Sequence, residues 1–212
     1  MIFLGRGLKP HRSPSQAAHL GRGFFDWYDW CEHSNQLKEP RPKLTTERIC
    51  HGAHCEFSVD HLLLEPGVYV SRIDRDPATG VAVTTFDLRL TTPNKEPVMN
   101  TAECHTIEHL GATFLRNHAE WSSRIVYFGP MGCRTGFYLV VFGEVTSEEI
   151  LPLVRELFEF VAGFEGDVPG AAPEECGNYL DQNLPMANWL ARRYLDRDLA
   201  DIDEKHLHYQ QA

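Results

Sequence analysis

The stretch GVYVSRIDRDPATGVAVTTFDLRL, residues 67–90, decides the fold of this chain. Apolar and polar residues alternate over 67–73 and again over 81–90, which is the period of a half-buried strand. The residues between them, Asp74–Gly80, carry the Asp, Pro and Gly that are typical of turns. The two runs therefore predict a β-hairpin.

The residues that follow the hairpin mix helical and strand patterns without regular alternation. Apolar residues at helical spacing predict a helix over 101–118, and Thr146–Glu149 is a capping box that predicts a helix to residue 162. Further elements are predicted as strands over 124–128 and 136–143, a tight turn over 129–132, and a last helix over 184–195. This order favours an α+β fold with a mostly antiparallel sheet.

Composition and charge exclude several classes of protein. The 212 residues carry a formal net charge of −10, with 42% hydrophobic and 24% charged residues, as in ordinary globular proteins. The acidic balance argues against nucleic acid as a partner, and no apolar run approaches the roughly 18 residues of a membrane span. No export signal is visible, so we expect a cytoplasmic protein. Residues 1–55 lean basic, which predicts a poorly ordered N-terminal extension before a domain over 56–212.

Six cysteines are present in a chain too large to depend on disulfides. Without an export signal, free thiols and metal ligation are the favoured interpretation. The cluster Cys50–Cys55 packs two Cys and two His too tightly to close a tetrahedron around one zinc ion. Cys104 is expected to pack within its helix. The others are Cys31, Cys133 and Cys176.

The motif HTIEH, residues 105–109, is the strongest chemical signal. On a helix, positions i, i+3 and i+4 share one face, so His105, Glu108 and His109 lie together. Two imidazoles one turn apart can bind one metal ion, and the carboxylate beside them can move protons at a bound oxygen. The same H-x-x-E-H pattern occurs in one class of metallopeptidases. Surface or capping roles remain the alternative for these three residues.

Two cysteines lie in settings that allow chemistry. Cys133 follows the Gly-Pro-x-Gly turn between two expected strands, where it is either a buried structural thiol or an activated thiolate. Cys176 lies in the polar segment Pro173–Asn178. With the two histidines it would give a three-ligand metal site with an open fourth position. Spacing along the chain does not decide whether these three side chains meet.

These motifs resemble the S-ribosylhomocysteine lyase (LuxS) family. The matching segments, in the family's order along the chain, are FSVDH (57–61), FDLR (86–89) followed by Pro93-Asn94, HTIEHL (105–110), PMGCRTG (130–136) and ECGN (175–178). The resemblance covers about residues 56 to 196, and five motifs together are far more specific than one. It implies a four- to five-stranded sheet packed on one face by helices, as in a LuxS/metallopeptidase-like fold, and a homodimer with active sites at the interface.

The resemblance also implies an activity and its residues. The family cleaves the thioether of S-ribosyl-L-homocysteine, giving homocysteine and 4,5-dihydroxy-2,3-pentanedione, the precursor of autoinducer 2. Its metal is Fe²⁺, replaceable by Zn²⁺ or Co²⁺. By motif, the ligands are His105, His109 and Cys176, the principal acid–base group is Cys133, and the second is Glu108. The implied substrate contacts are Phe57, His61 and Arg89 from the opposite subunit, and Arg116 near the amino-acid end of the substrate.

The chain departs from the family pattern at three positions, and two other functions remain open. Glu56 and Gly129 stand where serine is common, and Tyr127 stands where many members carry an acidic residue near the substrate. The alternative, an H-x-x-E-H metallopeptidase, needs a downstream glutamate as third ligand and no essential Cys133. The third hypothesis is a non-enzymatic metal-dependent binding module, with the aromatic segment Phe24–Trp30 as its partner surface.

Overall fold

The computed structural model describes residues 59–210, which fold around one antiparallel sheet. The strands are β1 (Gly67–Arg75), β2 (Ala82–Arg89), β3 (Ile125–Pro130) and β4 (Gly136–Phe142). The helices are α3 (Thr101–Asn117), α4 (Ser147–Gly163) and α5 (Leu184–Arg193). Shorter turns are η2 (Ser122–Arg124), η3 (Tyr194–Leu199) and η4 (Glu204–His206). The α+β class with a mostly antiparallel sheet is therefore confirmed.

The sheet has the strand order β1-β2-β4-β3, and each neighbouring pair is antiparallel. β1 and β2 form the predicted hairpin, with Gly67 opposite Arg89. Because side chains alternate across a strand, Phe86 and Leu88 of β2 point to one face of the sheet. Asp87 and Arg89 point to the opposite face and are also buried. One strand thus supplies both the core and a polar pair.

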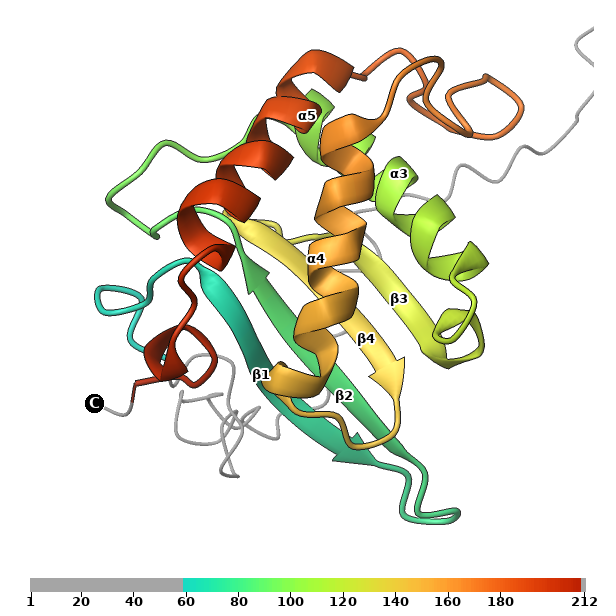
Figure 1. Ribbon diagram of the computed structural model, residues 1–212. Coiled ribbons are helices and arrows are strands. Elements are labelled where there is room, and N and C mark those ends of the chain that lie inside the picture. The colour runs from blue at the N-terminus through green and yellow to red at the C-terminus, as the bar shows by residue number, and fades with distance from the viewer. Residues whose placement is uncertain (1–58, 211–212) are drawn as a thin grey trace, which may run out of the picture. The chain divides into compact units, whose positions relative to one another are not determined.

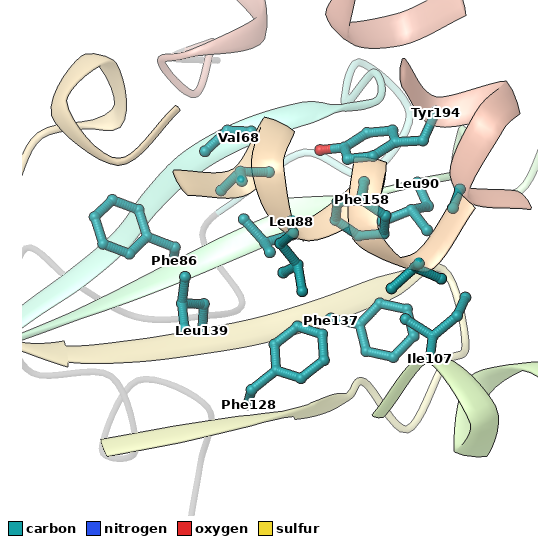
Figure 2. Packing of buried hydrophobic residues seen from close by; sticks show 14 of the residues in the cluster. Val68, Phe86, Leu88, Leu90, Ile107, Phe128, Phe137, Leu139, Phe158 and Tyr194 are labelled. Carbon is teal, nitrogen blue, oxygen red and sulfur yellow. The ribbon is translucent and has the colours of Figure 1, made fainter. Parts of the chain in front are cut away.

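The helices lie on one side of the sheet (Figure 1). α4 contacts β1, and α3 packs against β3. Figure 2 shows Phe158 of α4 and Tyr194 of η3 in the same cluster of packed side chains as the sheet residues Val68 and Leu88. The two rings meet edge to face with centroids 4.8 Å apart. Burial of each such side chain contributes about 1.5–3 kcal/mol to stability, so this layer holds the helices in place.

Side-chain caps fix where the two long helices begin. The Asn100 backbone N–H donates to the Glu103 carboxylate over 2.6 Å at the start of α3. At the start of α4, the Thr146 N–H donates to Glu149 over 2.8 Å, and the Glu149 N–H donates to the Thr146 hydroxyl. The predicted capping box is thus confirmed. Each cap satisfies N–H groups that a helix start leaves unpaired.

Two segments differ from the sequence prediction. β3 continues through Pro130, so the tight turn begins at Met131. The last helix passes into the π turn η3, and the chain then returns over β1, where the His206 carbonyl lies against Gly67. Leu207 is buried by this return. Periodicity does not predict such a return, because the segment is short and its burial comes from β1 rather than from its own pattern.

Several predictions fall on residues that the structure does not describe. They concern the extension over 1–55, the aromatic segment Phe24–Trp30, the cluster Cys50–Cys55, and Glu56 and Phe57. The domain division at residue 55 and the homodimer remain predictions.

Candidate metal centre and thiol site

Helix α3 presents two imidazoles on one face. The Nε2 atoms of His105 and His109 lie 3.0 Å apart, as expected for residues one turn apart. Ile107 and Leu110, on another face of the same helix, are fully buried in the core. The helix is thereby held with its histidine face toward the loop that follows α4.

The loop between α4 and α5, residues 164–183, brings the third candidate ligand to α3. The Cys176 Sγ lies 3.3 Å from His105 Nε2. One atom from each of His105, His109 and Cys176 lies within 4.8 Å of the others, and together they could hold a metal ion. The three side chains predicted as ligands therefore meet, although Cys176 is 71 residues from His105 in the sequence.

Backbone carbonyls fix the orientation of both imidazoles. The Nδ1 atom of His105 lies 2.9 Å from the Asp181 carbonyl, and that of His109 lies 2.7 Å from the Pro169 carbonyl. An Nδ1–H that donates to a carbonyl leaves the Nε2 lone pair free for a metal. Two borderline-soft nitrogens and one thiolate suit Fe²⁺, Co²⁺ or Zn²⁺, so the donor set fits the expected ions.

Thr106 ties the ligand loop to α3, a role that sequence reasoning missed. Its buried hydroxyl accepts a hydrogen bond from the Asn183 N–H over 2.8 Å and lies 2.8 Å from the Gln182 side-chain amide. The Gln182 amide also lies 3.2 Å from His105 Nδ1. The position of Thr106 between the two histidines is only a weak sequence signal for this role. Its partner Gln182 is 76 residues away in the sequence, so the contact becomes visible only in the folded structure.

The turn after β3 presents Cys133 as an exposed thiol. Its Sγ lies 3.0 Å from the Thr135 hydroxyl and 3.9 Å from Arg89 Nη1. Burial by itself raises the pKa of this thiol. Hydrogen bonds from the Thr135 hydroxyl and backbone, with the positive charge of Arg89, outweigh burial and lower the pKa. The activated-thiolate interpretation is thus favoured over the buried structural one.

A buried ion pair lies beside the thiol. Arg89 Nη2 donates to Asp87 Oδ2 over 2.5 Å, and Arg89 Nη1 donates to the Thr135 hydroxyl. Arg89 therefore reaches Cys133 of its own chain, whereas the resemblance implied that it acts from the opposite subunit. His61 is exposed and lies close enough to Asp87 to affect the pKa of that carboxyl. Sequence reasoning missed Asp87, although its i, i+2 relation to Arg89 on one strand places both on one face.

Glu108 lies where α3 meets the edge strand β3. A Cβ at Gly129 would lie 3.2 Å from Glu108 Oε1 and would overlap the Tyr127 hydroxyl. The tyrosine ring thus folds over the glycine, and its hydroxyl lies close to this carboxylate. The two departures from the family pattern, Tyr127 and Gly129, are therefore sterically linked.

Arg116 is placed at a distance from these contacts. It is exposed in the last turn of α3, and no hydrogen bond or ion pair holds its side chain among the described interactions. Cys104 is buried, as expected for helix packing, and burial raises its pKa to about 12. Glu108 and Cys133 also influence the pKa of Cys104 electrostatically. The first turns of α3 therefore lie close to the turn that carries Cys133.

The site combines two imidazoles and one thiol that could hold a metal ion. A second thiol, Cys133, has a lowered pKa. This combination is that of a metalloenzyme whose metal ion has three protein ligands. Residues 55–205 match the family model described as S-Ribosylhomocysteinase (LuxS), so the chain belongs to the LuxS family of carbon–sulfur lyases.

The family match is supported by full-length relatives named S-ribosylhomocysteine lyase. The protein of Clostridium acetobutylicum is 60% identical over 153 residues, which cover 72% of this chain and 95% of the relative. That of Clostridium beijerinckii is 58% identical with the same coverage. That of Finegoldia magna is 56% identical over 140 residues, or 66% of this chain and 87% of the relative. Among residues 59–210, no helix has the length and apolar character needed to span a membrane.

Proposed function

We propose that this chain cleaves the thioether of S-ribosyl-L-homocysteine to L-homocysteine and 4,5-dihydroxy-2,3-pentanedione. The observation that carries the proposal is the convergence of His105, His109 and Cys176 at one point. The relatives named above support the same reaction. A metallopeptidase of the H-x-x-E-H class is disfavoured because the third donor beside the two histidines is a thiol rather than a glutamate.

We assign the three converging side chains as ligands of a resident Fe²⁺ ion, with Zn²⁺ or Co²⁺ able to substitute. When bound, the ion supplies Lewis acidity to the carbonyl and hydroxyl oxygens of the sugar. The chain's own part is to hold the donors in place. The carbonyls of Asp181 and Pro169 orient the imidazoles, and the Asn178 N–H points at the Cys176 sulfur over 3.4 Å.

We assign Cys133 as the principal acid–base group. A C–S bond to an unactivated carbon does not break by simple hydrolysis. Two enolisations move the sugar carbonyl along the chain until the sulfur is β to it, and elimination then breaks the bond. Each enolisation needs a base that takes a proton from one carbon and returns it to the next. Thr135 and Arg89 lower the pKa of this thiol, which favours the thiolate that can act as the base.

Glu108 is the second acid–base group in this proposal. Its position in the chain between the two histidines supports a role at the substrate oxygens, which must gain and lose protons as the carbonyl moves. In the elimination, the C–S bond electrons leave on sulfur, and Glu108 supplies the proton that turns this thiolate into homocysteine.

We propose substrate contacts at four further residues. Arg89 and His61 lie on or near the polar face of the sheet, where a guanidinium and an imidazole can bind hydroxyl or carboxylate groups. Arg116 is assigned to the amino-acid end of the substrate, to which it offers an exposed positive charge. Phe57, outside the described residues, is assigned by motif alone.

We infer a homodimer with active sites at the interface. On the sheet face away from the helices, Phe142 is 46% exposed and Tyr127 is 48% exposed. Exposed aromatic side chains on a sheet face fit contact with a second copy. Size-exclusion chromatography with light scattering tests the dimer, and a monomer at micromolar concentration would contradict it.

We also propose a cytoplasmic place for the enzyme, in the methyl cycle and in autoinducer synthesis. Cys104, Cys133 and Cys176 are free thiols, as expected in a reducing compartment. The partner is the small-molecule substrate, and neither nucleic acid nor membrane takes part.

Thiol release tests the function. The protein is purified without oxygen, loaded with Fe²⁺ or Co²⁺ and given S-ribosylhomocysteine, and free homocysteine is followed with a thiol reagent. We expect release by the unaltered chain and none by Cys133→Ala. No release from the folded, metal-loaded protein would contradict the proposal.

A further inference from the structure

The last residues of the described chain lie beyond the LuxS match, which ends at 205, yet they contact the buried Asp87–Arg89 pair. Three contacts hold this segment, together with Lys205 at the end of the match, against the start of α4 and the residue Glu65 before β1. The Leu207 carbonyl accepts a hydrogen bond from Ser147 over 2.9 Å, and Lys205 and His206 pair with Glu65. Leu207 itself is buried. The segment is thus a fixed part of the fold up to its last described residues.

Tyr209 is the residue through which this segment reaches the polar pair. Its hydroxyl donates a hydrogen bond to Asp87 Oδ2 over 2.9 Å. Its ring stacks on Tyr69, with centroids 4.8 Å apart and planes 12° from parallel. The hydroxyl of Tyr69 is used elsewhere, because it donates to the carbonyls of Glu65 and Lys205. One tyrosine therefore binds the carboxylate and the other binds backbone.

The Asp87–Arg89 pair is held in an incomplete geometry. Arg89 contacts Asp87 through Nη2 alone, and both Asp87 Oδ1 and Arg89 Nε are buried without a hydrogen-bond partner in the described structure. Arginine and carboxylate usually pair through two parallel hydrogen bonds, which would satisfy both atoms. The Tyr209 hydroxyl donates to Oδ2, the same oxygen that Arg89 Nη2 contacts. The other arm of the guanidinium, Nη1, contacts Thr135 and Cys133.

We propose that Tyr209 is a positioning residue: it keeps Asp87 from closing a two-bond pair with Arg89, so that Arg89 stays beside the Cys133 thiol. This proposal rests on the proposed function in one respect, the acid–base role of the Cys133 thiol. Without the Tyr209 hydroxyl, the carboxylate turns to pair with Arg89 Nε and Nη2, and Nη1 moves away from Cys133.

Arg89 is the charged side chain that contacts the Cys133 thiol. Arg134 follows Cys133 in the same turn, and Cys104 and Glu108 of α3 lie near this turn. From β2 come Arg89 and, behind it, Asp87. His61 acts on Asp87 rather than directly on the thiol. Withdrawal of Arg89 therefore removes a positive charge that lowers the pKa of Cys133.

The test is the pH dependence of Cys133 alkylation by iodoacetamide in the zinc-loaded full chain, resolved by peptide mass spectrometry. In Tyr209→Phe the ring keeps its stacking, so we expect an unchanged fold. We expect the midpoint of the alkylation profile to rise and the rate at pH 7 to fall about threefold, because only the thiolate reacts. An unchanged or lowered midpoint would overturn the proposal. Alkylation needs no lyase turnover, so failure of the proposed function gives a separate result.

Tyr69→Phe is the matched control. It removes a hydroxyl from the same tyrosine stack but leaves the Asp87 hydrogen bond intact, so we expect a lower melting temperature without a change in the alkylation midpoint. If Tyr69→Phe shifts the alkylation midpoint as much as Tyr209→Phe does, the shift comes from general destabilisation of the segment and the proposal is overturned. A chain ending at His208 lacks Tyr209 altogether and should reproduce the shift of Tyr209→Phe. If it does not, the assignment to Tyr209 is wrong.

Discussion

The Thr135 hydroxyl lies 3.0 Å from the Cys133 sulfur and also accepts a hydrogen bond from Arg89. An arginine only donates, so it occupies a lone pair of the hydroxyl oxygen and leaves the hydroxyl proton free. That proton is available for donation to the sulfur of a Cys133 thiolate. Thr135 thereby stabilises the thiolate directly, and its hydrogen bond from Arg89 holds the positive guanidinium beside the sulfur.

Thr135→Val should raise the pKa of Cys133, because the thiolate loses this hydrogen bond. The native pKa is lowered by this contact, so its removal leaves a smaller fraction of thiolate at a given pH. A rise of about one pKa unit would slow turnover by up to about tenfold on the acid side of the profile and move the profile to higher pH. The pH profile of homocysteine release measures this. Thr135→Ser keeps the hydroxyl and should retain the profile; a shift in this control would implicate packing instead.

Gly170→Ala should weaken metal binding. Gly170 has a φ of +72°, and a Cβ there would lie 3.1 Å from His109 Nδ1. The methyl group crowds the imidazole at its hydrogen bond to the Pro169 carbonyl. Loss of such outer contacts typically costs about 10–100-fold in metal affinity. Competition with a zinc chelator measures it.

Gly166→Ala is the control for backbone strain. Gly166 has a φ of +104°, and a Cβ there would meet nothing within 4 Å. We expect a strained loop but near-normal zinc affinity. Equal losses in the two variants would show that strain, rather than the His109 contact, sets the affinity.

Gly129→Ala should lower activity by displacing Tyr127 and crowding Glu108. The added Cβ overlaps the Tyr127 hydroxyl, so the tyrosine ring must move if the backbone of β3 is to stay unchanged. Gly129→Ala with Tyr127→Ala should regain activity relative to the single Gly129→Ala variant, since the obstructing ring is gone. Steady-state kinetics of the two single variants and the double variant measure the coupling. Additive losses in the double variant would rule out the steric link.

Leu157→Ala should destabilise the fold. Leu157 on α4 is fully buried in the core, and removal of its branched side chain leaves a cavity. Urea unfolding should show a loss of about 2–5 kcal/mol. Leu157→Met keeps the volume and should cost less than about 1.5 kcal/mol. Similar costs for the two variants would mean that the site relaxes around the cavity.

Local sequence patterns were sufficient where each element carries its own signal. The hairpin of β1 and β2, the helix over His105 and His109, and the capping box at Thr146 could be predicted because alternation, helical spacing and cap residues act over a few residues. The π turn after α5 and the return of the last residues over β1 carry no such signal.

The sequence by itself determined which chemical groups are available: two histidines and a glutamate on one helix face, and two cysteines in turns. Tertiary structure decided which groups meet. It placed Cys176 against His105, Thr135 and Arg89 against Cys133, and Tyr209 against Asp87. The reason is physical. Spacing within a helix or strand follows from its own geometry, whereas contacts between distant segments depend on how buried faces pack and how long loops close.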